Sequence, residues 1–160
     1  MIIKPLGPRE RLPREIAPEN AKQSRTWQDD EEKWGANYAI DLDTRTMSST
    51  QPDSDEVAWL EVSLDRPYCV YQVDWQGADA RAWLSWTCSR TDCSTCHDDP
   101  DRCGYFALTV GMAKEIPEIL LPPVSGCRYG DRVKLQQIKE RDGSHGFMVH
   151  EIVIIEHQGM

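Results

Sequence analysis

One short stretch of the sequence concentrates side chains that bind hard cations. In YAIDLDTRTMSST, residues 38–50, Asp41 and Asp43 stand one residue apart and a run of hydroxyl side chains follows them. Calcium takes about six to eight oxygen ligands from carboxylates, carbonyls and hydroxyls. The same pattern also suits an Asx turn, in which carboxylates accept hydrogen bonds from local backbone N–H groups. The stretch therefore predicts either a cation site or a capped turn.

A further carboxylate, that of Glu151, stands in an unfavourable environment. In FMVHEIVII, residues 147–155, both faces of the alternating pattern are apolar, and Glu151 has apolar neighbours on its own face. A buried carboxylate is costly unless it is paired, protonated or bound to a cation. We therefore expect Glu151 either at the rim of a sheet, with its carboxylate in water, or facing the acids of the 38–50 stretch.

The cysteines form the next group with its own chemistry. Four of the six fall within CSRTDCSTCHDDPDRC, residues 88–103. An even, clustered set is typical of disulfides in an oxidised extracellular protein, whereas the one C-x2-C pair leaves zinc or free thiols as the alternative. We expect the clustered four to pair among themselves and the outer two to pair with each other. The full set is Cys69, Cys88, Cys93, Cys96, Cys103 and Cys127.

Composition excludes several classes of protein. The formal net charge of the 160 residues is -9 and no Lys/Arg cluster stands out, which argues against nucleic-acid binding. No apolar run approaches the roughly 20 residues that span a bilayer. No nucleophile elbow, H-E-x-x-H or P-loop is present, and the four histidines are scattered, so we expect no enzyme. The histidines are His97, His145, His150 and His157.

The elements that must position these groups are short strands. Residues 1–20 are a Pro-rich arm, and residues 19–40 are expected to be mostly loop with one short turn. The 21–160 region alternates apolar and polar residues in short segments separated by Gly, Pro and Asp, which predicts an all-β jelly-roll β-sandwich. The predicted strands cover 57–64, 68–75, 80–88, 105–111, 131–138 and 147–155.

The order of these segments resembles the discoidin, or coagulation-factor C-type, domain superfamily, and within it the F-type lectins (fucolectins). The stretches that carry the resemblance are AKQSRTW, YAIDLDTRTMSST, AWLEVSLDRPYCVYQV, GCRYGDRVKLQ and HEIVIIEH. Together they extend over about residues 20–157. The resemblance implies a galactose-binding-domain-like jelly roll, here with a Cys-rich loop insertion that is longer than the family's loop.

The resemblance also implies a calcium ion, held in F-type lectins by the acidic loop and the end of the last strand. Carried over position by position, His150 replaces a Cys that contributes only its backbone carbonyl. Leu42 replaces a Gly, so a positive φ at this position would strain the loop. The implied ligands are Asp41, Asp43, Ser49, His150 and Glu151.

The fucose site of that family is matched only in part by this sequence. The position of its His reads Gln51 or Pro52, and the region of its double Cys is rewritten. Arg supplies directional donors to sugar hydroxyls, and a Trp ring is suited to stack on a sugar, although core packing is the alternative role for the Trp residues. The candidate ligand-binding residues are Arg81, Trp83, Arg90 and Arg102.

We therefore expect a noncatalytic, secreted recognition domain, stabilised by calcium, that binds a carbohydrate or glycoprotein through loops at one end of the sandwich. The alternative is a protein–protein adhesion or assembly module of the same fold without a sugar site. Competition by free sugars distinguishes the two hypotheses.

Overall fold

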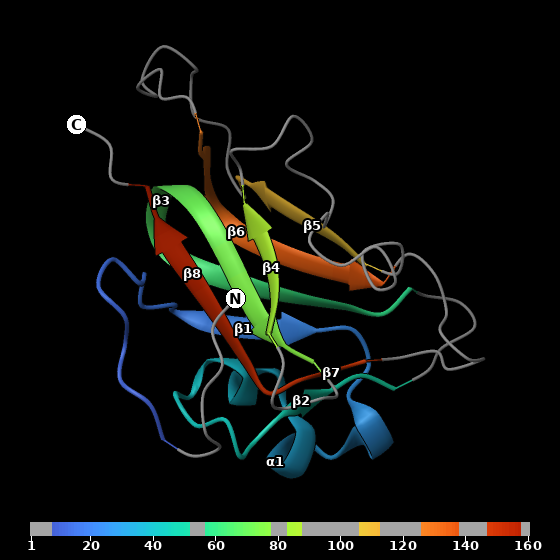
Figure 1. The fold of residues 1–160 in the computed structure, drawn as a ribbon. Coiled ribbons are helices and arrows are strands. Elements are labelled where there is room, and N and C mark those ends of the chain that lie inside the picture. The colour runs from blue at the N-terminus through green and yellow to red at the C-terminus, as the bar shows by residue number, and fades with distance from the viewer. Residues whose placement is uncertain are drawn as a thin grey trace.

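The computed structural model of the chain describes residues 8–51, 57–77, 83–87, 106–112, 126–137 and 147–157. These residues are mostly β, as predicted, with three short helical segments near the N-terminus (Figure 1). The strands are β1 (Asn20–Gln23), β2 (Ser48–Ser49), β3 (Trp59–Gln76), β4 (Trp83–Thr87), β5 (Phe106–Gly111), β6 (Arg128–Gln137), β7 (Met148–Val149) and β8 (Glu151–Glu156). The helical segments are η1 (Trp27–Asp29), α1 (Glu31–Trp34) and η2 (Ala36–Ile40).

The long strand β3 takes part in both layers of a sandwich-like arrangement. Its first half pairs with β1 and β6, and its second half pairs with β4 and β8. The register with β6 shifts between Ser63 and Tyr68, where β3 bends back over itself (Figure 1). Pro67 lies in this interval, and proline has no N–H to donate to a neighbouring strand. The two strands predicted for 57–64 and 68–75 are therefore one bent strand.

The core lies between these layers. Leu60 and Val62 on β3 and Val133 and Leu135 on β6 are all at most 1% exposed. They alternate with polar residues because successive side chains of a strand point to opposite faces. Trp86 on β4 is equally buried, which agrees with the core-packing role for that Trp.

The last predicted strand is divided at His150. Met148–Val149 forms β7 and pairs with β2, whereas Glu151–Glu156 forms β8 and pairs with the second half of β3. Residues Ile152, Val153 and Ile154 are all buried, so both faces of β8 are covered, as the apolar pattern on both faces predicted.

The region predicted as loop, residues 19–40, contains more structure than expected. Its first residues form β1 because the exposed edge of β3 supplies them with backbone partners. Asp30 caps α1 by accepting a hydrogen bond from the Lys33 N–H at 3.2 Å. The expectation of one short turn was thus wrong, since neither edge pairing nor capping leaves an apolar period in the sequence.

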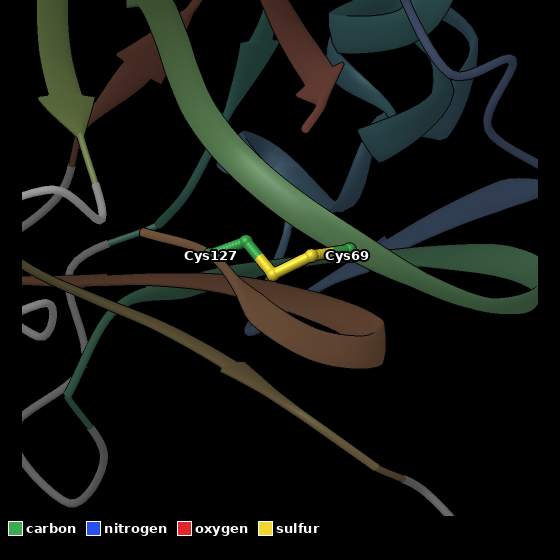
Figure 2. The surroundings of a disulfide bond; sticks show 2 residues. All are labelled: Cys69 and Cys127. Carbon is green, nitrogen blue, oxygen red and sulfur yellow. A yellow bond between two sulfur atoms is a disulfide. The ribbon is translucent and has the colours of Figure 1, made fainter. Parts of the chain in front are cut away.

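A disulfide ties the second half of β3 to the start of β6. Cys69 and Cys127 form this bond, with their Cα atoms 5.4 Å apart (Figure 2). This is the pairing expected for the two outer cysteines. The clustered cysteines and the rest of the Cys-rich insertion, residues 88–105, lie outside the described residues. In the described part of the chain, no helix is long and apolar enough to cross a membrane.

Candidate functional site

The segment that contains Asp41 and Asp43, here called the acidic loop, holds these two carboxylates by local hydrogen bonds. The Asp43 N–H donates to Asp41 Oδ1 at 3.0 Å, which is an Asx turn. The backbone N–H of Arg45 donates to Asp43 Oδ1 at 2.9 Å, and the Arg45 guanidinium reaches both oxygens of the same carboxylate. The side-chain hydrogen bonds from Arg45 lower the pKa of Asp43. Leu42, between the two acids, has a φ of 63°, the conformation that the replaced glycine would adopt without strain.

Ser49 and His150, which the resemblance also implies as ligands, are both buried and are hydrogen-bonded to other segments of the protein. Ser49 is buried in β2, and its carbonyl accepts a hydrogen bond from Gln23 Nε2 at 3.3 Å. The His150 N–H donates to the Gln76 carbonyl at 2.9 Å, and its ring Nδ1 lies 3.1 Å from the Thr44 carbonyl. His150 therefore fixes the turn between β7 and β8.

Glu151 faces the acidic loop from the start of β8, and its partner comes from the N-terminal arm. The carboxylate is 0% exposed, so the rim alternative is wrong. Arg9 Nη2 donates to Glu151 Oε1 at 3.1 Å. The same guanidinium forms a two-pronged pair with Glu15, with both N–O distances at 2.7 Å. The side chains of these three residues are 6%, 1% and 2% exposed, in the order Arg9, Glu151, Glu15.

The electrostatics of this buried trio favour a protonated Glu151. The pKa of Glu151 is raised to about 8, chiefly by burial and further by the nearby Asp41 carboxylate, while Arg9 and the Leu42 backbone act in the opposite direction. One guanidinium therefore contacts two buried carboxyl groups, and it bonds Glu15 through both of its terminal nitrogens. The proximity of Asp41 shows that the fold does bring the acidic loop and Glu151 together.

The donor set matches calcium poorly in this arrangement. The ion needs about six to eight oxygen ligands, whereas the Arg45 guanidinium already pairs with both oxygens of Asp43. Among the described residues, Glu151 Oε2 is buried without a hydrogen-bond partner of good geometry, although the Leu42 backbone acts on this carboxyl group, and a single oxygen is not a calcium site. Within the described ranges, no group of three or more His, Cys, Asp or Glu side chains is arranged to hold a metal. Calcium binding stays a prediction from the sequence.

A groove of about 600 Å³ lies beside the acidic loop, between β1, η2 and the start of β3. Its walls combine one indole ring with charged and polar side chains, a mixture found in ligand-binding pockets. Asn37 Oδ1 accepts from the Ala21 N–H at 2.9 Å, which leaves the amide NH2 group to donate to a ligand. The lining side chains with chemistry are Lys22, Glu31, Asn37, Tyr38, Asp41 and Trp59.

Sequence reasoning did not single out this groove. Asn37 and Tyr38 follow a glycine in a region predicted as loop, and Trp59 lies within the strand predicted for 57–64 with no binding role assigned to it. The Lys134 ammonium lies 5.0 Å from the centroid of the Trp59 ring, a cation–π contact that holds the ring in place. The signal that points to the groove is three-dimensional, because its walls come from separate segments.

The residues predicted to bind the ligand are largely beyond what the structure describes. Arg81, Arg90 and Arg102 lie outside the described residues, and Trp83 is described only as the first residue of β4. Their role stays a prediction. Arg9 and Glu15 are the residues that sequence analysis missed in the acidic site, because the arm carries no apolar period and only its prolines stood out.

Comparison with known proteins shows what the fold is shared with. No family model and no curated protein matches the chain. Among solved structures, chitosan-binding module 1 of a chitosanase/glucanase from Paenibacillus sp. IK-5 matches with a TM-score of 0.54 and 13% identity, over 87% of this chain and 95% of that one. The chain has a galactose-binding-domain-like fold. This agrees with the resemblance in sequence.

Two further matches extend the comparison to other sugar binders. A fucolectin from striped bass (Morone saxatilis) serum has a TM-score of 0.52 and 16% identity, over 89% of this chain and 47% of that one. The family 32 carbohydrate-binding module of NanJ from C. perfringens was solved with galactose. It has a TM-score of 0.53 and 14% identity, over 86% of this chain and 93% of that one. Identities this low establish the fold alone.

Proposed function

We propose that this protein is a noncatalytic carbohydrate-recognition domain, and that the groove beside η2 is a binding site for its glycan. The observation that carries the proposal is the combination of Trp59 with planar polar side chains in this groove. Sugars present an apolar C–H face and a rim of hydroxyls. An indole ring suits that face, and amide and carboxylate groups suit the hydroxyls.

The size and polarity of the groove support this function. Its volume of about 600 Å³ is within the range of small-ligand pockets. It contains both a donor-only side chain, Lys22, and acceptor-only carboxylates, Glu31 and Asp41. Hydroxyl groups both donate and accept, so a polyhydroxylated ligand satisfies such a mixed lining better than an apolar ligand does.

The compartment that suits this function is an oxidising one. The Cys69–Cys127 disulfide supports a secreted protein, because such bonds persist mainly outside the reducing cytosol. The structural matches are themselves binding modules or lectins, which supports a domain without catalysis of its own.

A glycan array followed by titration of the best binder tests the proposal. We expect Trp59→Ala to weaken binding by about tenfold or more, since loss of an aromatic contact with its buried area costs roughly 1–3 kcal/mol. Asn37→Ala is expected to weaken binding as well. The matched control is Trp27→Ala, because Trp27 is 36% exposed and does not line the groove.

Three results would count against parts of the proposal. If glycans bind and neither groove variant changes the affinity, the site lies elsewhere, and the predicted residues Arg81, Trp83, Arg90 and Arg102 become the next variants. If no glycan binds, the carbohydrate function is wrong. A protein ligand whose binding free sugars do not inhibit would then favour the adhesion module.

A further inference from the structure

The N-terminal arm, residues 8–16, is fixed against the sandwich at both of its ends. The Arg9 N–H donates to the Leu42 carbonyl at 2.8 Å, which attaches the arm to the acidic loop. The Ile16 N–H donates to the Ile154 carbonyl at 2.8 Å, which attaches it to β8. Because the backbone is held at these two places, the side chain of Arg9 is delivered to the space between the loop and β8.

The arm carries its own counter-charge as well as the cation. Glu15 Oε1 accepts hydrogen bonds from Arg9 Nη1 at 2.7 Å and from the Leu12 N–H at 3.0 Å. A two-pronged bond between guanidinium and carboxylate fixes the orientation of both groups. The guanidinium also donates to Glu151 Oε1, so the Arg9 side chain adds a link between the arm and β8.

We propose that the guanidinium of Arg9 is the resident cation of this protein, in the position between the acidic loop and Glu151 where the sequence resemblance implies calcium. The guanidinium balances the charge of Glu15 and donates a hydrogen bond to Glu151, so the buried acid of the apolar strand has a polar partner. A divalent ion bound to Glu151 would stand next to the guanidinium, and two like charges repel strongly in a buried site. This inference is independent of the carbohydrate ligand.

Two measurements on the intact wild-type chain test whether calcium binds at all. We expect the thermal midpoint to be the same with excess calcium chloride and with EDTA, and we expect no heat when calcium chloride is titrated into metal-free protein. A ligand that binds only the folded state raises the midpoint by mass action, so bound calcium would be visible as a shift of several degrees.

Variants of Arg9 test whether its guanidinium is the cation that stabilises this site. We expect Arg9→Ala to lower the midpoint by on the order of 10 °C, because the variant leaves buried Glu15 without its counter-charge and buried Glu151 without its hydrogen-bond donor. The thermal midpoint of Arg9→Lys is expected to lie between those of the wild type and Arg9→Ala, since lysine keeps the charge and loses the two-pronged geometry. The control is Arg25→Ala, whose ion pair with Asp29 has side chains 53% and 67% exposed and is expected to shift the midpoint by no more than about 2 °C.

The opposite pattern would overturn the proposal. In that pattern calcium raises the wild-type midpoint, EDTA lowers it, and Arg9→Ala behaves like Arg25→Ala. If Arg9→Ala does not fold, the calcium and EDTA comparison on the wild type and the position of Arg9→Lys relative to the control still decide between guanidinium and calcium.

Discussion

At the scale of single residues, Glu151 makes stability depend on pH. Its pKa is about 8 in the folded protein, against an ordinary value of 4.5, because the carboxyl group is buried. Between these two values the folded state binds more protons than the unfolded state. The contribution of Glu151 to the free energy of unfolding therefore falls as pH rises, by up to about 1.4 kcal/mol per pH unit.

We expect Glu151→Gln to remove this contribution. A glutamine resembles the protonated acid at every pH, so the variant should gain stability relative to the wild type as the pH rises from 4.5 to about 8. Urea unfolding of both proteins at several pH values measures the difference. A difference that stays constant over this window would show that Glu151 is ionised throughout.

The residues of the acidic site differ in how far the sequence could predict them. The closeness of Asp41 and Asp43 made the Asx turn one of two predicted alternatives, because its hydrogen bonds reach only two residues along the chain. The need of Glu151 for compensation was also predictable from its apolar neighbours. The identity of the partner was not, since Arg9 is 142 positions away and nothing local marks it.

At the scale of elements, the Cys69–Cys127 disulfide sets the position of β6 on the bent part of β3. It links residues separated by 58 positions, and a loop of that size restricts the unfolded chain enough to stabilise the folded state by about 4 kcal/mol. We expect the double variant Cys69→Ala/Cys127→Ala to unfold at a clearly lower urea concentration. Equal midpoints for variant and wild type would mean that the bond restricts both states alike.

The pairing of β5 with β6 makes a separate prediction, at Gly130. A Cβ added there would lie 2.4 Å from the Gly111 carbonyl oxygen, which is closer than real Cβ atoms approach. We expect Gly130→Ala to destabilise the protein by about 1–3 kcal/mol, as overpacking does. Gly111→Ala is the matched control on the partner strand, because an added Cβ there meets nothing within 4 Å. Equal midpoints for the two variants in urea would refute the close approach.

The elements themselves were predictable where alternation was strong. The strands around Val62, Val73 and Val133 were expected from their period of two, and the buried pattern of β8 from its two apolar faces. What could not be read was the joining of two predicted strands into β3. β3 pairs with β6 both before and after its bend, and this pairing depends on strands that are distant in the sequence. Pro67, by contrast, is typical of the end of a strand.

At the scale of the whole molecule, the net charge of -9 restricts the glycans that approach the groove. A negative surface repels acidic ligands and attracts cationic ones at long range, and added salt screens both effects. We expect neutral and amino sugars to bind in preference to uronic-acid and sialylated glycans. An array run at low and high salt measures this, with amino-sugar binding falling as salt increases. Preferential binding of acidic glycans would contradict the expectation.

The shared use of β3 by both layers also constrains how the protein is synthesised. The first half of β3 pairs with β1, which the ribosome makes earlier, whereas the second half pairs with β8, which it makes much later. Until residues 151–156 emerge, the apolar face and one edge of β3 lack their native cover, and such surfaces are the ones that aggregate or bind chaperones. A nascent chain of this protein is therefore expected to stay open to chaperone binding until β8 is available.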